Sequence, residues 1–331
     1  MPREIVINGR FLSRPITGVE RYAREITNLF TGKYRVETTR LNGIAGHAWE
    51  QFILPGRLTR DSILWSPANT GPLRVRNQAL TIQDLSTLEH PEWFRASFAM
   101  WYRFFLPILA RRVRAVFTPS EHVRQKVLRR FGNANVLAIP SGVNTAFFHP
   151  TATQSIHRLP DRYILFVGSL EPRKNLPALI NAWDQIKHEF PDVGLVIAGT
   201  AGHVFRPVKL PQGDPNLYFT GYLGAELPGL YANAELFVLP SMDEGFGLPA
   251  LEAMACGTPV IVSNGGALPE VVGDAGLIFD LEQPDTLIQV MRTCLRDKDL
   301  RASLIEKGLA RAGQFTWQNT AHVIWNTLNE L

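Results

Sequence analysis

The chain has 331 residues, of which 45% are hydrophobic, 19% charged and 10% aromatic, a composition that fits a globular protein and excludes disordered and fibrous classes. Its two cysteines have no histidine or cysteine partners at ligand spacing, so neither a structural disulfide nor a zinc site is expected. No segment approaches the roughly 20 apolar residues that cross a bilayer, and the first residues lack a signal pattern, so we expect a cytoplasmic protein.

Charge is distributed unevenly along the chain. Residues 1–150 contain 21 lysines and arginines against 10 acidic residues, a net charge of +11, whereas residues 151–331 carry a net charge of −7. Nineteen of those 21 cations are arginine, which favours recognition of phosphate groups. An anionic membrane and nucleic acid both fit this charge. The sequence lacks the aromatic pairs, recognition helix and zinc spacing of nucleic-acid-binding modules, so no nucleic acid partner is expected.

Apolar segments of strand and helix length alternate in both halves of the chain, which predicts two parallel sheets with helices on both faces. The stretch 140–160 has no apolar period and is assigned as the interdomain linker. In the first half, strands are expected at 5–7, 62–65, 79–82, 115–117 and 136–139, and helices over 19–29, over 91–112 and from 120. In the second half, strands are expected at 163–167, 194–198, 217–219, 236–239, 260–262 and 278, and helices over 175–190, over 227–232, around 252 and from 284.

The segment 315–331 is amphipathic if helical, so it must bury one face, and we expect it to return to the first domain. The predicted fold class is therefore α/β, with two doubly wound, Rossmann-like domains facing each other across a cleft. The first domain would comprise 1–150 plus 316–331, and the second 151–315. A cleft between two such sheets could hold two substrates at once, an acceptor on the side of the first domain and a donor on the side of the second. The residues expected on the buried face of the last helix are Trp317, Val323, Ile324, Trp325 and Leu328.

A glycine-rich turn between two glutamates is the most informative motif. In residues 241–259, SMDEGFGLPALEAMACGTP, seven residues separate Glu244 from Glu252. Such a turn, opening into a helix, leaves backbone N–H groups at the positive end of the helix dipole, where they can hold an anionic or oxygen-rich ligand. Acidic residues enriched at a helix start are the alternative. Two carboxylates within reach of one ligand favour a sugar-nucleotide site.

A second motif places two cations at the end of a strand. Residues 168–175, GSLEPRKN, follow the apolar strand 163–167 and precede a helix. Arg173 and Lys174 would there neutralise a diphosphate and stabilise its departure as a leaving group. The alternative is a solvated basic pair, although cations oppose the dipole at a helix start. No G-x-G-x-x-G or Walker A loop accompanies these motifs, so an NAD or ATP site lacks its usual pattern.

Together these motifs resemble the retaining glycosyltransferases of family 4, which have the two-domain GT-B fold. The resemblance rests on the Glu-x7-Glu element, EPRKN after a strand, and Gly221-Tyr222-Leu223. In the first half, ITGVERY at 16–22 is similar to the family's glycine loop entering a helix. Residues 85–94, LSTLEHPEWF, are similar to the segment after its His-Asp motif. The resemblance covers nearly the whole chain.

The resemblance implies roles for the matching residues. Glu244 would contact hydroxyls of the donor sugar, and Glu252 those of the ribose. Backbone N–H groups of the glycine turn would hold the sugar and phosphate, and Tyr222 would lie near the base. The implied catalytic positions are Glu244, Asp84, Lys174 and Arg173, and the implied donor-binding positions are Gly18, Gln83, Ser169, Tyr222, Gly245, Phe246, Gly247, Leu248 and Glu252.

Two positions depart from the family pattern. Gln83 stands where many relatives have histidine before Asp84, and an amide can hydrogen-bond a hydroxyl but cannot act as an acid or base. Ser169 stands where many have arginine, which leaves Arg173 and Lys174 as the evident cations. No residue stands out as a nucleophile. The resemblance implies front-face attack assisted by the leaving phosphate, with the protein supplying positioning and electrostatics.

Neither a metal nor a cofactor is expected, because the nucleotide sugar is a substrate. The stretch Asp297-Lys298-Asp299 matches the D-x-D pattern that binds a metal in the other major glycosyltransferase fold, but its polar surroundings indicate surface charge. Asn69, in WSPANT, is placed on the acceptor side of the cleft, with a plain turn as an equal alternative.

The segment 93–114 combines aromatic residues with arginines, as suits the headgroup region of an anionic membrane. A core helix whose aromatic residues face the sheet is the alternative left open. The residues concerned are Trp101, Tyr102, Phe104 and Phe105 with Arg103, Arg111, Arg112 and Arg114.

The sequence thus predicts a retaining, metal-independent hexosyltransferase, cytoplasmic or peripheral on the inner face of the membrane. It would move a mannose-, glucose- or rhamnose-like hexose from a nucleotide diphosphate sugar to a glycan acceptor, expected to be lipid-linked, in cell-surface polysaccharide or O-antigen synthesis. The alternatives are a nucleotide-sugar epimerase or phosphorylase of the same architecture and, more remotely, a nucleic-acid-binding protein. Glu244→Ala and Lys174→Ala are each expected to abolish transfer and leave the fold intact.

Overall fold

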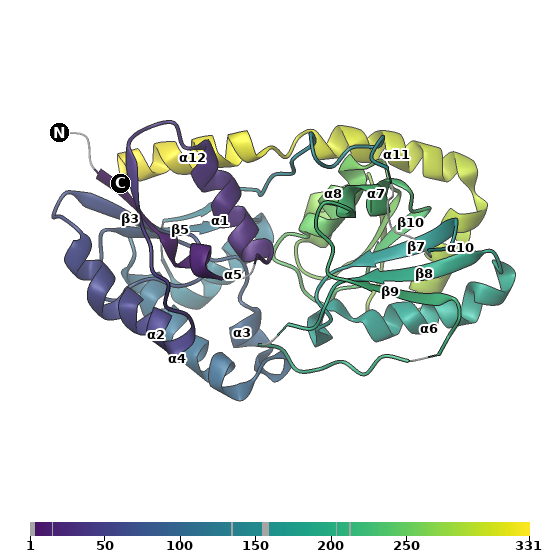
Figure 1. The fold of residues 1–331 in the computed structure, drawn as a ribbon, viewed down its shortest axis with the longest axis horizontal. Helices are drawn as coiled ribbons and strands as arrows, with labels where there is room; N and C mark the ends of the chain where they lie inside the picture. The colour runs from purple at the N-terminus through teal and green to yellow at the C-terminus, as the bar shows by residue number, and fades with distance from the viewer. Residues whose placement is uncertain (1–3, 15, 134, 154–158, 203, 212) are drawn as a thin grey trace. The chain divides into compact units, whose positions relative to one another are not determined.

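The computed structural model describes residues 4–14, 16–133, 135–153, 159–202, 204–211 and 213–331 (Figure 1). The chain divides into two compact units. Unit 1 comprises Met1–Pro91, Ala96–Gly142 and Thr316–Leu331, and unit 2 comprises Glu92–Arg95 and Val143–Phe315. Among the described residues, no helix is long and apolar enough to cross a membrane.

Unit 1 contains a six-stranded parallel sheet with the strand order β2-β1-β3-β4-β5-β6. Its inner strands are runs of β-branched and other apolar residues, because helices cover both faces of a parallel sheet. The strands are β1 (Glu4–Asn8), β2 (Tyr34–Glu37), β3 (Ser62–Ser66), β4 (Gln78–Thr81), β5 (Ala115–Thr118) and β6 (Val136–Ala138).

Several helices of unit 1 begin at residues that cap them. Thr17 and Glu20 form a capping box at α1, and the Ser120 hydroxyl accepts a hydrogen bond from the backbone N–H of Val123 at the start of α5. The helices are α1 (Gly18–Leu29), α2 (Gly43–Ala48), a π-helical turn (Trp49–Ile53), α3 (Ser86–Glu89), α4 (Ala96–Arg112), α5 (Glu121–Phe131) and α12 (Trp317–Glu330), with 3-10 turns at Gly9–Ser13, Leu54–Arg57 and, on the segment that passes to unit 2, Pro91–Trp93.

Helix α12 lies beside α1 in unit 1 (Figure 1). The Trp317 ring centroid is 6.0 Å from that of Tyr22 in α1, and the Thr320 hydroxyl donates to the Pro140 carbonyl at 2.6 Å. The buried face follows a helical spacing through Trp317, Thr320, Ala321, Ile324 and Leu328. The sequence-based assignment of Val323 to this face was wrong, because this residue is 42% exposed. Adjacent residues of a helix point in different directions, and Val323 lies outside the spacing that the buried residues follow.

Unit 2 contains a second six-stranded parallel sheet, with the strand order β12-β11-β10-β7-β8-β9. The order reverses between β7 and β10, and ligands of open α/β sheets bind at such a switch point, at the carboxyl ends of the strands. The strands are β7 (Arg162–Val167), β8 (Val193–Ala198), β9 (Leu217–Gly221), β10 (Leu236–Leu239), β11 (Val260–Ser263) and β12 (Leu277–Phe279). The helices are α6 (Leu176–Ile186), α7 (Leu227–Ala232), α8 (Leu248–Ala255), α9 (Leu268–Val272), α10 (Asp285–Arg296) and α11 (Lys298–Ala312), with 3-10 turns at Pro172–Lys174 and Lys187–Glu189.

Two segments of unit 2 differ from the sequence-based expectation. Val143 and Phe148, in the stretch assigned as a linker, are buried in the core of unit 2. The helix expected over 91–112 begins only at Ala96, because Pro91–Trp93 forms a 3-10 turn and the backbone around Phe94 pairs with another segment of unit 2. Phe94 forms an antiparallel bridge with Phe205, and their rings are tilted by 39° with centroids 5.0 Å apart.

Candidate functional site

Two cations lie at the switch point of unit 2. Arg173 and Lys174 occupy the 3-10 turn Pro172–Lys174, which follows the central strand β7. The Lys174 side chain is buried and that of Arg173 is largely buried. Burial of two positive charges is costly unless anionic groups compensate them.

Glu244, which follows the neighbouring strand β10, supplies that compensation. Its Oε2 lies 2.7 Å from Nη1 of Arg173, and its Oε1 lies 2.5 Å from Nζ of Lys174. The Ser241 hydroxyl also donates to Oε1, at 2.7 Å. Burial alone would raise the pKa of Glu244, but Arg173 and Lys174 outweigh it and lower this pKa to about 2. Glu244 is therefore ionised at neutral pH.

A second carboxylate completes this cluster, which we call the switch-point cluster: Arg173, Lys174, Glu244 and Glu171. Glu171 is buried and accepts a hydrogen bond from Nε of Arg173 at 2.9 Å. Its other oxygen accepts from the Ser169 hydroxyl at 2.7 Å. Two cations thus face two carboxylates. Sequence reasoning missed Glu171, although an acid two positions before a buried arginine could have indicated it.

This arrangement revises one sequence-based expectation. Removing the Glu244 carboxylate would leave two buried cations without their shared counter-ion, which is strongly destabilising in protein interiors. Glu244→Ala is therefore not expected to leave the stability unchanged.

The glycine turn after Glu244 is fixed by its backbone. Gly247 has a φ of 103°, and a Cβ at this position would lie 2.6 Å from Cδ2 of Leu268. Only glycine fits both conditions, and α8 begins at the next residue, Leu248. Phe246 is buried with its ring 5.7 Å from that of Phe315, so its backbone rather than its side chain is available to a ligand. Gly245, between Glu244 and Phe246, is also buried.

A glycine that sequence reasoning missed supports this turn from the end of β11. Gly266 has a φ of 65°, and a Cβ there would lie 2.3 Å from the backbone nitrogen of Glu244. The next residue, Ala267, donates its backbone N–H to the Glu244 carbonyl at 2.9 Å. The Glu244 backbone is therefore held against a neighbouring strand end.

Glu252 and Tyr222 lie elsewhere in unit 2. Glu252 is buried on α8 and accepts a hydrogen bond from the Tyr231 hydroxyl at 3.0 Å. Tyr222 directly follows β9 and is 67% exposed, so its ring is accessible to a ligand. Tyr222 follows the carboxyl end of β9, and Glu252 lies on α8, the helix that comes after β10.

The four sequence-predicted residues of unit 1 also follow its strands or open its first helix. Gly18 begins α1, and a Cβ there would meet no atom within 4 Å. Asn69 has a φ of 58° and its Oδ1 accepts the backbone N–H of Gln83 at 2.7 Å. Nε2 of Gln83 is buried without a hydrogen-bond partner among the described residues. Asp84 accepts hydrogen bonds from the backbone N–H and hydroxyl of Ser86, the first residue of α3, at 3.0 and 2.5 Å.

Comparison with known proteins places this chain in a family. The profile of the glycosyl transferases group 1 matches residues 151–311. O-antigen chain mannosyltransferase B of Escherichia coli is 31% identical over 277 residues, which cover 78% of this chain and 72% of that protein. The chain belongs to the group 1 glycosyltransferases. The serotype-specific mannosyltransferase WbdA of Escherichia coli is 35% identical over 240 residues, although these cover 66% of this chain and only 29% of WbdA.

The fold of this glycosyltransferase is GT-B, as predicted. The crystal structure of Anabaena Alr3699/HepE in complex with UDP and glucose matches it with a TM-score of 0.76 and 17% identity, over 99% of this chain and 100% of that one. Sucrose-phosphate synthase from Thermosynechococcus elongatus matches with a TM-score of 0.75 and 18% identity, over 99% and 98% of the two chains. Likenesses at this level of identity establish the fold alone.

The D-x-D stretch of the glycosyltransferase has a structural role. Asp297 caps α11, because its side chain accepts the backbone N–H of Leu300 at 2.9 Å.

Proposed function

We propose that this glycosyltransferase transfers a hexose from a nucleotide diphosphate sugar to a glycan acceptor in the synthesis of a cell-surface polysaccharide such as an O-antigen. The observation that carries the proposal is the switch-point cluster, where two buried cations after β7 face the carboxylate of Glu244 after the adjacent strand β10. Mannose is the first sugar to test, because relatives that match this chain are mannosyltransferases. Glucose- and rhamnose-like donors are the next.

In the proposed reaction, Arg173 and Lys174 stabilise the charge that develops on the departing diphosphate. Glu244 is already engaged by both cations, which suits a role in orienting them and contacting donor hydroxyls rather than attack on the sugar. Glu252 would bind the ribose, and Tyr222 the base. We propose retention of the anomeric configuration by front-face attack, in which the leaving phosphate assists deprotonation of the acceptor. Neither a metal nor a cofactor takes part in this scheme.

Unit 1 would supply the remaining donor contacts and the acceptor side. Gly18, whose α-carbon faces open space, would let the backbone approach the diphosphate. The unpartnered amide of Gln83 would donate to a sugar hydroxyl, and Asp84 would act beside it. Asn69, which holds the Gln83 backbone, would lie at the acceptor.

The proposal is tested by transfer assays with Lys174→Ala. Nucleotide release from GDP-mannose, UDP-glucose and dTDP-rhamnose is measured with and without mannoside acceptors. We expect Lys174→Ala to lower kcat at least about 100-fold, the scale of losing one charge-stabilising group. The control is Lys187→Ala, which removes a surface lysine paired with Asp184 and Asp214. Near-normal turnover of Lys174→Ala would refute the proposal, and conversion of the donor sugar without an acceptor would indicate an epimerase instead.

The nucleotide is identified separately by thermal shift with UDP, GDP, dTDP and ADP. The matching nucleotide should stabilise the protein by about 2.7 kcal/mol at a hundredfold excess over its dissociation constant. The anomeric configuration of the product, read by NMR, tests retention.

We further propose that the acceptor is lipid-linked and that unit 1 docks on an anionic membrane. Helix α4 buries Tyr102 and Phe105, but Phe104 is 67% exposed and Ile108 is also exposed. The helix thus buries some of its aromatic side chains, and the exposed ones support the proposed docking. Exposed arginines follow on the same helix, and arginines beside exposed apolar groups suit an anionic headgroup region. Ile44 and Phe52, on α2 and the adjoining π-helical turn, and Met100 on α4 are also exposed.

Sedimentation with vesicles tests this docking. Wild-type protein should bind phosphatidylcholine vesicles containing phosphatidylglycerol more strongly than pure phosphatidylcholine vesicles, and Phe104→Glu should reduce the bound fraction. Val323→Glu, at an exposed apolar position on α12, is the matched control. Equal binding of Phe104→Glu and Val323→Glu would refute the proposed surface.

A further inference from the structure

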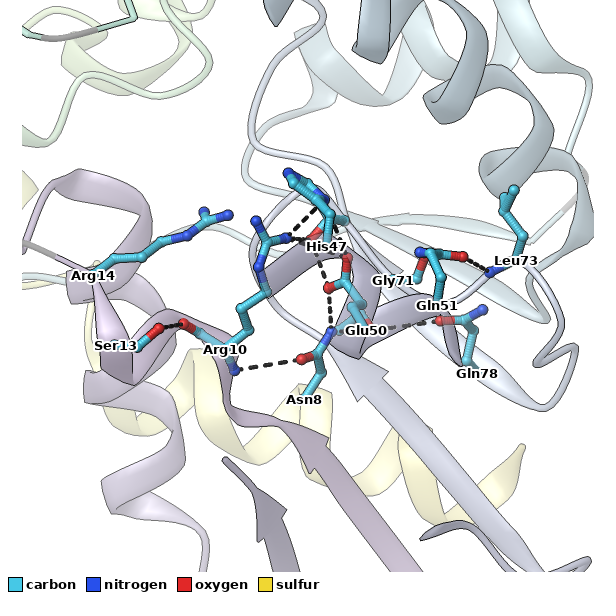
Figure 2. A network of polar contacts seen from close by, with 12 residues as sticks. Asn8, Arg10, Ser13, Arg14, His47, Glu50, Gln51, Gly71, Leu73 and Gln78 are labelled. Atoms are coloured by element: carbon cyan, nitrogen blue, oxygen red, sulfur yellow. Dashed lines mark hydrogen bonds and ion pairs between the residues drawn. The ribbon is translucent and has the colours of Figure 1, made fainter. Parts of the chain in front are cut away.

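A network of buried polar groups in unit 1 lies outside the residues discussed so far (Figure 2). At its centre is Glu50, fully buried on the π-helical turn. Its carboxylate accepts hydrogen bonds from Nδ2 of Asn8 at 2.7 Å, the Thr70 hydroxyl at 2.8 Å and Nη1 of Arg10 at 3.2 Å. Asn8 ends β1 and Thr70 follows β3, so the network lies at the carboxyl end of the sheet, where α/β proteins bind ligands.

Stability alone does not account for this network. A buried ion pair often contributes no more than apolar residues of the same volume would. Nε of Arg10 is buried and has no hydrogen-bond partner among the described residues, which is a further cost. Glu50 also lies on a π-helical turn, a conformation that is found frequently at functional sites.

The network fixes the state of His47, which is 19% exposed. Its Nδ1 lies 3.1 Å from Nη1 of Arg10, and since an arginine can only donate, Nδ1 accepts and the proton resides on Nε2. Oε2 of Glu50 is 3.7 Å from the same nitrogen, too far for a hydrogen bond. Burial, aided by the charge of Arg10, lowers the pKa of His47, so the ring is neutral at pH 7. His47 is thus held as an uncharged donor through Nε2.

An exposed aromatic ring lies next to this donor. Trp101, on α4, is 40% exposed, and its ring centroid is 5.0 Å from that of His47. Behind it the buried Phe105 stacks on the indole, with centroids 5.1 Å apart and an interplanar angle of 17°. The indole is therefore supported by a core residue and also accessible to solvent. Arg14, which extends toward the Arg10 guanidinium, adds further donors (Figure 2).

The local charge indicates which ligand suits these groups. Arg10 is compensated by Glu50, and Arg14 lies 3.5 Å from Glu20. With His47 neutral, the formal charges of this group sum to zero, so an anion gains little here. A neutral molecule with one apolar face and several hydroxyls fits better, because it can cover an aromatic ring and accept from fixed donors.

We propose that Trp101, His47 and Arg14 form the recognition site for a neutral sugar ring of the acceptor. The C–H face of the ring packs on the indole of Trp101, and its hydroxyl oxygens accept from Nε2 of His47 and from Arg14. Arg10 and Glu50 are positioning residues that hold the His47 tautomer. This inference rests on the proposed glycosyl transfer, but its test does not require turnover.

Saturation-transfer NMR with the intact protein tests the site directly. The probes are methyl α-mannopyranoside, methyl α-glucopyranoside and methyl α-rhamnopyranoside. We expect at least one probe to receive saturation on its ring C–H protons, and Trp101→Ala and His47→Ala to reduce that signal at least about fivefold. Trp101→Tyr and His47→Gln should restore part of it. The matched control, His322→Ala, removes an exposed histidine of α12 that contacts Asn326, and should keep the wild-type signal.

Kinetics separates this site from the donor site. Where the wild type transfers a hexose, Trp101→Ala should raise the KM for the acceptor about tenfold and change the KM for the donor less than twofold. Thermal unfolding of each variant is measured in parallel, and His47→Gln provides a mild substitution if His47→Ala unfolds. Absence of saturation transfer to all three probes, or wild-type signals in Trp101→Ala, would overturn the inference. If the wild type transfers nothing but the NMR result holds, the proposed function fails and the sugar site stands.

Discussion

Glutamine at position 244 would test the switch-point cluster most directly. Glu244→Gln keeps the shape of the side chain but removes the negative charge between Arg173 and Lys174. The pKa of Glu244 falls from 4.5 to about 2 on folding, and at about 1.4 kcal/mol per unit this corresponds to about 3 kcal/mol of stability. That value lies at the lower end of the roughly 3–5 kcal/mol lost when one partner of a buried ion pair is removed. For a domain of this size we expect the Tm to fall by about 6–12 °C.

Differential scanning fluorimetry with inorganic pyrophosphate checks both the magnitude and its cause. In Glu244→Gln two cations face one carboxylate, so pyrophosphate should raise the Tm of the variant more than that of the wild type. The control is Glu189→Gln, which removes a carboxylate paired with Arg292 and Arg296 at the surface and should change the Tm little. A wild-type Tm for Glu244→Gln, or equal stabilisation of both proteins by pyrophosphate, would refute the reasoning.

Two further predictions concern the same unit. Because the pKa of Glu244 is lower in the folded than in the unfolded chain, its stabilisation should be complete above about pH 4.5 and be lost as the pH falls toward 2. Urea titrations between pH 5 and 3 should show this loss in the wild type and a smaller one in Glu244→Gln; identical pH profiles would contradict it. Gly247→Ala should destabilise the protein by about 1–3 kcal/mol, because it combines a positive φ with a contact to Leu268. Gly18→Ala, which meets open space, should leave the free energy of unfolding unchanged, and equal effects of the two substitutions would contradict the argument.

Much of the architecture could be predicted from the sequence, because strands of a parallel sheet are buried on both faces. The run Arg162–Val167 is almost continuously apolar, as are its neighbours β8 and β10. Strand β2 was missed, since it lies at an edge of its sheet and carries Arg35 and Glu37. The segment Glu92–Arg95 was assigned to the helix that follows it, because its backbone partners lie more than a hundred residues away around Phe205.

The candidate site could be predicted only in part, for a related reason. Local motifs located the cations at 173 and 174 and the carboxylate of Glu244, because each lies in the loop that follows an apolar strand. Their pairing with one another depends on β7 and β10 being neighbours, which no local pattern reveals. The network joins three separate segments, which carry Asn8 with Arg10, Glu50 and Thr70. None of these segments carries a recognisable spacing.

The return of α12 to unit 1 has a consequence for biosynthesis. Trp317 and Trp325, which pack against Tyr22 and Phe30, are translated only after every residue of unit 2. On the ribosome the unit that starts the chain is therefore the later one to complete its core, which inverts the usual order of cotranslational folding. Until α12 has been synthesised, Tyr22 and Phe30 lack the packing of Trp317 and Trp325. A nascent chain stalled before residue 316 would expose these apolar side chains to chaperones.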